Sequence, residues 1–348
     1  MTLLRVEQSA AERAEPSQSR NLPVSAQRAQ CAELNNCSPA SAPVSSAHEY
    51  AVAGRIAREA LELAVNLVEE NALLLDLAER VEGLIISRGA RPAFPVNISI
   101  NNVAAHYSPG IDDSSRIPPG ALVKVDIGVH VNGYIVDAAV TVPLDKRWTL
   151  LAEAAREALR AALTVMKHNT PVNSVAKAVA ETIEERGFKP VKNLTGHMVD
   201  RYVLHAGKTL PNVPDAEYLR TRVLAGEVYA VEPFATTGRG YVVNQGASHI
   251  YRVVSVKKMK EDATASEYLE VLWREFRGLP FSERWLPKLG ITLKDLEKLV
   301  KARRIHHYPR LVEASGGFVS QFEDTALVLE NSCVPLARVL EIENNPKN

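Results

Sequence analysis

The stretch 123–140, VKVDIGVHVNGYIVDAAV, decides the fold of this chain because it predicts a β-hairpin that carries two aspartates. Asn132-Gly133 stands between two runs of alternating apolar residues, which is the strongest short-range signal for a two-residue type I′ turn. If these residues form the turn, period-two alternation places Asp126 and Asp137 on the same face. They are then diagonal neighbours on adjacent strands, with Cα atoms roughly 7–8 Å apart.

This aspartate pair indicates a cation site. A carboxylate within an apolar strand is costly to bury unless a positive group compensates it. Two carboxylates on one face therefore require one cation or more than one. The alternative is a partly solvated hairpin with two surface aspartates, since Val123, Val125, Ile127 and Val129 fill only one face.

The composition fits a globular chain with one large core or two smaller ones, because 46% of its 348 residues are hydrophobic. With 41 basic and 41 acidic residues, it gives no general reason to expect a nucleic acid or a membrane surface as partner. No run reaches the length of a transmembrane helix, and the three cysteines fit a reducing cytoplasm better than a disulfide framework. Residues 1–45, rich in Ala, Ser, Gln and Pro, predict a disordered extension ahead of a domain over 46–348.

Two helices followed by strands occur twice along this domain. The helical segments are 48–70 and 71–89, then 146–167 and 171–186, the last with Pro171 as its first residue; the strands lie at 94–101 and in the hairpin, then around 197, at 228–234 and at 319–329. This order predicts an α+β domain that is internally duplicated, with helices outside and a curved sheet inside.

A helical insertion interrupts the second half at about 253–309. Its predicted helices are 267–276 and 292–302, the second with Thr292 as N-cap. The run 303–307, RRIHH, and the lysines at 257, 258 and 260 are explained most simply as a solvated face. The alternative is contact with a polyanion such as ribosomal RNA.

Five further polar residues stand where an apolar environment is expected: His106, His197, His205, Glu232 and Glu323. Each alone is more often a satisfied buried polar residue than a ligand. With the aspartate pair they make three histidines and four carboxylates on predicted strands or strand ends. Such ligands suit Mn²⁺, Fe²⁺, Co²⁺ or Zn²⁺, while the lack of thiolates argues against a structural zinc site. The excess of acids over histidines suits a two-metal site.

In this order, the segments closely resemble the type 2 methionine aminopeptidases of the archaeal and eukaryotic kind, which remove the initiator methionine. The matching segments are FPVNISINNVAAHYSP (94–109), VDIGVHVNGYIVDAA (125–139), NLTGH (193–197), HAGK (205–208), VEPFA (231–235), LPFSERWL (279–286) and QFEDT (321–325). The resemblance implies the pseudo-symmetric pita-bread fold of creatinases and aminopeptidases. It also implies hydrolysis of the Met–Xaa bond of nascent chains, with Xaa small.

The same resemblance implies two divalent ions, Co, Mn, Fe or Zn, and a set of site residues. The implied ligands are Asp126, Asp137, His197, Glu232 and Glu323, with Asp137 and Glu323 bridging. Glu232 would also accept a proton from the attacking water, His205 would stabilise the oxyanion, and His106 would face the scissile nitrogen. Phe94, Leu204 and His249 match positions that line the methionine pocket, together with His106 and His205.

Two positions depart from the family. Asp324 replaces the usual histidine or asparagine after the bridging glutamate, and alternation predicts that it faces away from the metals. Met198 replaces a small residue and is expected to alter the pocket floor slightly.

Two rival interpretations share the fold. One is a prolidase or Xaa-Pro aminopeptidase, which carries a larger N-terminal domain; the other is a metal-free relative that binds RNA or protein. The preferred interpretation implies nascent polypeptide N-termini as partners, a monomer in the cytoplasm, no membrane, and leaves room for ribosome association.

Overall fold

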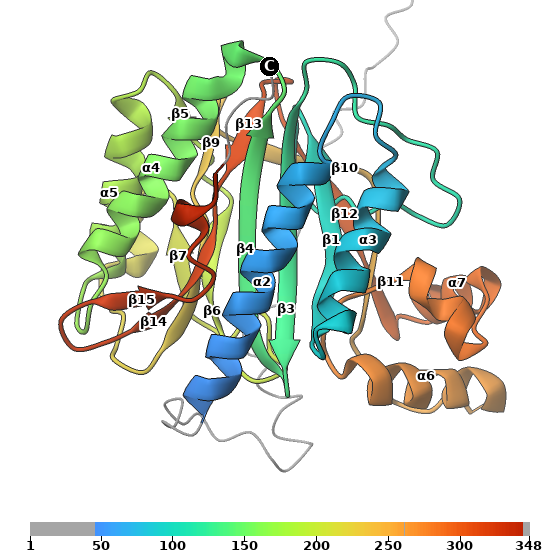
Figure 1. Cartoon of the computed structure of the whole chain (residues 1–348). Helices are drawn as coiled ribbons and strands as arrows, with labels where there is room; N and C mark the ends of the chain where they lie inside the picture. The colour runs from blue at the N-terminus through green and yellow to red at the C-terminus, as the bar shows by residue number, and fades with distance from the viewer. Residues whose placement is uncertain (1–45, 261, 344–348) are drawn as a thin grey trace, which may run out of the picture. The chain divides into compact units, whose positions relative to one another are not determined.

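The computed structural model describes residues 46–260 and 262–343, so the extension predicted over 1–45 lies outside the described residues. The first half contains α2 (Ala47–Leu67), α3 (Leu74–Ser87), β1 (Arg91–Ile100), β2 (Val103–Ala105), β3 (Leu122–Val131) and β4 (Tyr134–Pro143). β1, β3 and β4 form one antiparallel sheet in that order. Both helices lie across one face of this sheet (Figure 1). Within the described ranges, no helix is long and apolar enough to cross a membrane.

The hairpin has the predicted turn and register. Asn132 and Gly133 have φ angles of 51° and 89°, the left-handed values that a type I′ turn needs at both positions. In the resulting ladder Asp126 lies opposite Ala139, and Asp137 lies opposite Gly128. The prediction that both aspartates share one face is therefore confirmed. Helix α2 buries alanines against the other face, and these small side chains let the helix approach the sheet closely.

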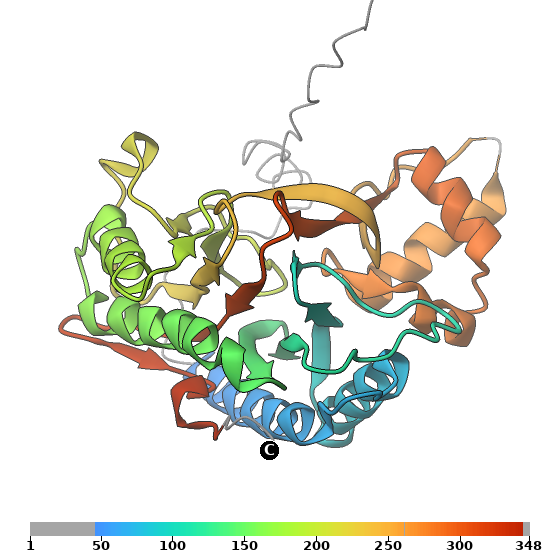
Figure 2. The same ribbon diagram turned by 90° about the horizontal axis from the view of Figure 1, so that it is seen from above.

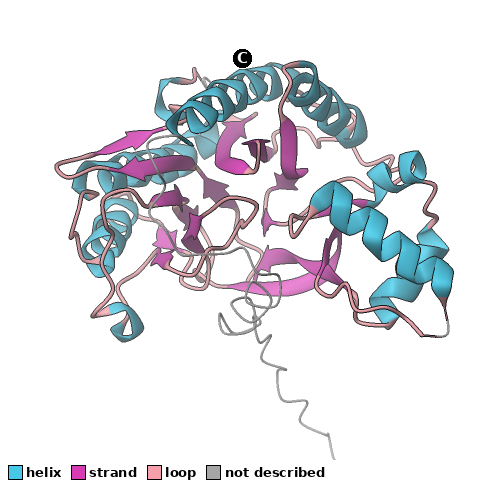
Figure 3. Cartoon of the chain, turned by 90° about the horizontal axis from the view of Figure 1, so that it is seen from below, coloured by secondary structure: helices cyan, strands magenta, loops and turns pink. Residues whose placement is uncertain are grey.

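The second half repeats the pattern of two helices and then strands. It contains α4 (Thr149–Val165), α5 (Val172–Glu184), β5 (Lys189–Pro190), β6 (Thr195–Val199), β7 (Thr209–Pro211), β8 (Val228–Val231), β9 (Phe234–Thr236), β13 (Val319–Gln321), β14 (Asp324–Val328) and β15 (Cys333–Pro335). The strands form a sheet in the order β15-β14-β8-β6-β7 and another in the order β13-β9-β5. Seen from above, α2 to α5 lie along the outer side of the strands, and β10 (Val242–Val253) and β12 (Ile305–Glu313) lie on the opposite side (Figure 2); the view from below shows the same arrangement (Figure 3).

Three details differ from the prediction. Pro171 has an extended ψ of 134° and precedes α5 as its N-cap, so it is not the first helical residue. The strands predicted at 228–234 and 319–329 are each divided in two, at Glu232-Pro233 and at Phe322-Glu323. In both places the chain passes from the five-stranded sheet to the three-stranded one or back. Each break therefore sets a glutamate at the junction of two sheets.

The segment predicted as an insertion contains α6 (Ala263–Phe276), β11 (Phe281–Ser282), a 3₁₀ helix at Glu283–Leu289 and α7 (Leu293–Lys301), flanked by β10 (Val242–Val253) and β12 (Ile305–Glu313). It has a hydrophobic cluster separate from the main core. Thr292 caps α7 through a capping box with Asp295, as its sequence predicts. The segment is fastened to α3 because the Arg284 guanidinium donates to both carboxylate oxygens of Glu82, at 2.9 and 2.7 Å.

Candidate metal centre

The two hairpin aspartates form one side of a buried acidic cluster. Asp137 is 4% exposed, and Asp126 is somewhat more accessible. Asn97 on β1 is paired with Asp126 in the ladder, and its amide lies 3.4 Å from Asp126 Oδ2. Lys124 does not neutralise the pair although it is buried two residues earlier on β3. Its ammonium instead donates to the carbonyl oxygens of Asn101 and Val319.

Glu323 reaches this cluster through a seam between β4 and the β13–β14 segment. At its centre, Ala139 and Glu323 exchange two backbone hydrogen bonds of 3.1 and 3.0 Å. On one side the Thr325 hydroxyl accepts from Asp137 N–H at 2.7 Å and donates to Asp137 C=O at 2.8 Å. On the other side the Thr141 hydroxyl bonds Gln321 N–H and C=O at 2.8 and 2.6 Å. Two threonine hydroxyls thus replace the ladder bonds that flank the central pair, and they hold both acidic residues in register.

His197 and Glu232 complete the cluster from β6 and from the end of β8. His197 Nε2 lies 3.6 Å from Asp137 Oδ2 and 3.4 Å from Glu232 Oε1. Asp137, His197 and Glu323 each offer a ligand atom, and these atoms lie within 4.8 Å of one another. The structure therefore brings together all five residues that the resemblance implies as ligands, although they come from five different places in the chain.

The charges of these groups are poorly tolerated without a cation. Burial raises the pKa of Asp126 to about 7. Burial and the neighbouring carboxylates raise the pKa of Asp137, Glu232 and Glu323 well above their usual values. Burial also lowers the pKa of His197 to about 4, so its ring is neutral at pH 7 and forms no ion pair with the carboxylates. A neutral imidazole among buried carboxylates has a free lone pair, which is the state required of a metal ligand.

The donor set fits divalent cations. Asp126 Oδ1, Asp137 Oδ1 and Glu323 Oε1 are buried and have no hydrogen-bond partner among the residues that the structure describes. Buried carboxylate oxygens are normally paired or coordinate a metal. Oxygen ligands with one imidazole suit Mn²⁺, Fe²⁺, Co²⁺ or Zn²⁺. The site thus has the charge and the unpaired oxygens that divalent ions require.

Two more histidines border the cluster. The ring centroid of His205 lies 4.2 Å from that of His197. His106 has a left-handed φ of 61° directly after β2. Burial lowers the pKa of both rings, that of His106 to about 4. Both are therefore neutral at pH 7 and can donate one hydrogen bond each.

Of the three residues matched to the methionine pocket, two lie together. Phe94 and Leu204 pack with Ile135, Leu279 and Tyr202 in a small apolar cluster. Phe94 occupies the space above Gly128, where a Cβ atom would lie 2.3 Å from its ring. The residue opposite Asp137 must therefore be glycine.

The third pocket residue, His249, has a different environment. Its Nδ1 lies 3.1 Å from Glu283 Oε1, and its ring contacts that of Tyr107 edge-on. The hydrogen bond to Glu283 raises the pKa of His249.

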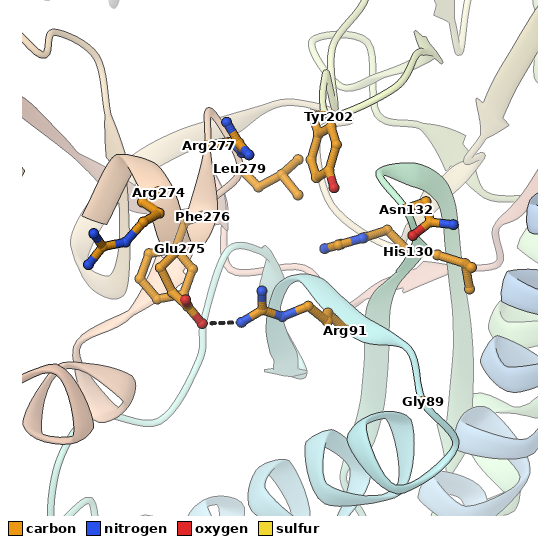
Figure 4. Close-up of a pocket in the computed structure, with 11 residues that line it drawn as sticks. Gly89, Arg91, His130, Asn132, Tyr202, Arg274, Glu275, Phe276, Arg277 and Leu279 are labelled. Carbon is orange, nitrogen blue, oxygen red and sulfur yellow. Dashed lines mark hydrogen bonds and ion pairs between the residues drawn. The ribbon is translucent and has the colours of Figure 1, made fainter. Parts of the chain in front are cut away.

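A separate pocket of about 300 Å³ lies between the hairpin turn and the end of α6 (Figure 4). Arg91 and Glu275 form an ion pair across it. It shares Tyr202 and Leu279 with the apolar cluster around Phe94. None of the four acids and the one histidine of the candidate metal centre lines it. It is distinct from the candidate metal centre.

The two departures from the family pattern lie away from the cluster. The buried Asp324 carboxylate accepts hydrogen bonds from the N–H groups of Ala337 and Val339, at 2.9 and 2.8 Å. Met198 packs against the main core. Strand alternation puts it on the face of β6 opposite to His197.

Sequence reasoning missed the residues that orient the acids. Gln321 Nε2 donates to Glu323 Oε2 at 2.8 Å. The Asn97 amide lies 3.4 Å from Asp126 Oδ2, and the Thr325 hydroxyl accepts from the Asp137 N–H. Such partners fix the orientation of a ligand. Period-two spacing from Glu323 points to Gln321 and Thr325, whereas Asn97 becomes visible only once β1 is paired with β3.

Comparisons with known proteins show which family this chain resembles. The model of metallopeptidase family M24 matches residues 48–330. A methionine aminopeptidase of Pyrococcus abyssi is 41% identical over 290 residues, which cover 81% of this chain and 96% of the relative. A methionine aminopeptidase of Thermotoga maritima has a TM-score of 0.62 at 20% identity, with 86% of this chain and 98% of that chain covered.

A prolidase from Pyrococcus furiosus has a TM-score of 0.56 at 18% identity, and the match covers 85% of this chain but 65% of the prolidase. Both solved structures have the pita-bread fold, so the predicted fold class is confirmed. The chain belongs to metallopeptidase family M24 and, within it, to the methionine aminopeptidases.

Proposed function

We propose that this protein removes the N-terminal methionine from nascent polypeptides by hydrolysing the Met–Xaa bond at a dinuclear centre, with Xaa small. The observation that carries the proposal is the convergence of two buried and two half-buried carboxylates and one neutral histidine beside two further histidines and an apolar cluster. We propose Asp126, Asp137, His197, Glu232 and Glu323 as the ligands of two ions, with Asp137 and Glu323 shared between them.

Divalent ions bound there would lower the pKa of a water molecule and polarise the scissile carbonyl. Glu232 is proposed to accept the proton of that water, because burial among acids gives its carboxylate a raised pKa and hence a high proton affinity. His205 and His106 are proposed to donate hydrogen bonds to the carbonyl oxygen and to the scissile nitrogen side. Their lowered pKa keeps both rings neutral at pH 7.

The methionine side chain is proposed to enter the apolar cluster that contains Phe94 and Leu204. His249 is proposed to border this site, held by Glu283. A thioether in an apolar pocket is recognised by packing, so discrimination against similar side chains should be modest.

The prolidase alternative is less favoured. The match covers 65% of the prolidase from Pyrococcus furiosus, but 96% of the methionine aminopeptidase from Pyrococcus abyssi. The metal-free alternative does not explain why the carboxylate oxygens of the cluster are buried and unpaired across the described residues. An enzyme with bound divalent ions accounts for both facts.

The test is release of free methionine from Met-Ala-Ser amide by protein whose bound metals have been counted. Turnover should stop in EDTA and return with Mn²⁺ or Co²⁺, and two ions per chain should be found. Asp137→Asn should abolish turnover, whereas Asp112→Asn is the matched control, an exposed aspartate with a left-handed φ that asparagine tolerates. Turnover that is indifferent to chelation would refute the mechanism, and faster cleavage of Ala-Pro-Ser amide would favour the prolidase alternative.

We further propose that the enzyme acts in the cytoplasm as a monomer and meets its substrates as they leave the ribosome. The sparse cysteines support a reducing compartment. Light scattering tests the monomer, and co-sedimentation with ribosomes tests the association.

A further inference from the structure

The β10–β12 ladder separates its side chains into two faces of different character. Arg252 on β10 lies opposite His306 on β12. The neighbouring residues Tyr251, Val253 and His307 point to the other face, where they contact the hydrophobic cluster of the insertion and the Tyr251 ring stacks on that of His307 at 4.5 Å. Alternation therefore leaves Arg252 and His306 on the face turned away from this cluster.

Period-two spacing assigns Arg304, which directly precedes β12, to the same face. It lies two residues before His306, and its carbonyl oxygen is fixed by hydrogen bonds from the N–H groups of Val254 and Ser255. Together, Arg252, Arg304 and His306 are called the cationic face here; its charge comes from the two arginines, because burial and the charge of Arg252 lower the pKa of His306. The sequence run 303–307 is thus divided, because only alternate residues lie on this face.

The cationic face continues directly from the candidate active site. The ring of His306 contacts that of Tyr308 edge-on at 4.8 Å, and Tyr308 contacts His106 in the same way at 5.6 Å. These contacts place the cationic face next to His106, and no residue of the apolar cluster around Phe94 and Leu204 takes part in them.

The two arginines lack partners. The Nε atoms of Arg252 and Arg304 are buried without a hydrogen-bond partner in the described part of the chain. Neither guanidinium forms an ion pair with any of the described carboxylates. Both arginines are half-buried, and an inaccessible N–H group normally has a hydrogen-bond partner, so this cationic face has the properties of a site for an anionic ligand.

We propose that the cationic face binds a carboxylate in the part of the peptide substrate that follows the scissile bond. This inference rests on the proposed function. With methionine in the apolar cluster and the scissile bond at the acidic cluster, the rest of the peptide extends past His106 and Tyr308. Two ring contacts of 4.8 and 5.6 Å separate His306 from His106, and an extended chain covers roughly 3.3–3.6 Å per residue. The second or third residue after methionine therefore reaches the arginines.

Guanidinium groups are the side chains best suited to carboxylates because they can donate two parallel hydrogen bonds. The carboxylate can come from an acidic side chain or from the free C-terminus of a short peptide. Two pairs of substrates distinguish these sources: Met-Ala-Glu-Ser amide against Met-Ala-Gln-Ser amide, and Met-Ala-Ser as free acid against its amide.

The experiment compares kcat/KM for these pairs at low ionic strength. The unmodified enzyme should prefer the carboxylate member of at least one pair by about tenfold, near the lower end for a hydrogen bond to a charged group. Arg252→Gln combined with Arg304→Gln should reduce this ratio to about twofold or less, and Arg252→Lys should retain part of it. Arg274→Gln is the matched control, because Arg274 is an exposed arginine on α6 with the same change in charge. Calorimetric binding of the product Ala-Glu-Ser amide should follow the same order without turnover.

The outcomes separate the two proposals. Cleavage of Met-Ala-Gln-Ser amide alone tests the proposed function, because this peptide carries no carboxylate. The inference is overturned if the unmodified enzyme cleaves Met-Ala-Gln-Ser amide as fast as Met-Ala-Glu-Ser amide and shows no preference between the free acid and the amide of Met-Ala-Ser. In that case the proposed aminopeptidase function still stands. The unmodified enzyme alone decides this if the double variant does not fold. If the variants weaken binding of a single-stranded RNA oligonucleotide but leave peptide selectivity unchanged, the face serves a polyanion and the inference is also overturned.

Discussion

Replacing Asp126 by asparagine should stabilise the metal-free protein near neutral pH, although it removes a proposed ligand. In the folded protein, burial raises the pKa of Asp126 from 3.8 to about 7. Well below pH 3.8 the carboxyl group is protonated in both states and does not change the free energy of unfolding. Between pH 4 and 7 the unfolded chain releases this proton and the folded chain keeps it, so the stability of the folded state falls as the pH rises.

The size of this effect follows from the same pKa. Each tenfold difference in proton affinity is worth about 1.4 kcal/mol, so the difference between 3.8 and about 7 is worth about 4 kcal/mol. Contact with solvent lowers this figure, which makes about 2–4 kcal/mol a realistic expectation at pH 7.5. The substituted amide would have no proton to lose, and its carbonyl oxygen can still accept from Asn97. With a divalent ion present at about 100 times its Kd, the free energy of unfolding of the unmodified protein should rise by about 2.7 kcal/mol. The variant should gain less or nothing, because it lacks one proposed ligand.

The assay is urea denaturation followed by circular dichroism at pH 4.5 and 7.5, first in EDTA and then with Mn²⁺. In EDTA, Asp126→Asn should be more stable than the unmodified protein by about 1 kcal/mol at pH 4.5 and by clearly more at pH 7.5, and Mn²⁺ should narrow or reverse the difference in stability. Asp112→Asn is the control, since this exposed aspartate should show no such pH dependence. A variant that is less stable than the unmodified protein in EDTA at pH 7.5 would show that Asp126 does not lie in a buried acidic cluster.

Three further substitutions test the supports of the site. Thr325→Val should lower the free energy of unfolding by about 2–4 kcal/mol because it leaves the buried N–H and C=O of Asp137 unpaired, whereas Thr325→Ser should be mild; equal losses would mean that the hydroxyl is not the bonding group. Asp324→Ala should cost about 2–4 kcal/mol through two unpaired N–H groups, with kcat nearly unchanged in the folded enzyme; a large fall in kcat would place Asp324 in the active site. Glu82→Ala should cost about 3–5 kcal/mol because it leaves the buried Arg284 guanidinium without its partner, and a thermal melt that does not shift would show that the insertion is held by other contacts.

Much of the local structure could be predicted because neighbouring residues determine it. Asn132-Gly133 requires left-handed φ angles at both positions, so the turn, the register and the common face of Asp126 and Asp137 follow together. The capping box at Thr292 is equally local. The match of seven short segments to a known family then indicated which distant acids and histidines belong to one site.

The tertiary structure alone decided how those residues meet. Glu232 and Glu323 reach the centre only because their strands break where the chain changes sheets, which depends on pairing partners far away in the sequence. The same holds for Asn97, Gln321 and Thr325, whose hydrogen bonds to the acids arise from contacts between strands. The run 303–307 looked like one basic surface segment, but its alternate residues lie on opposite faces of a pairing with β10. Period-two alternation divides side chains between two faces, and only the packing of the sheet determines which face meets the core and which meets the substrate.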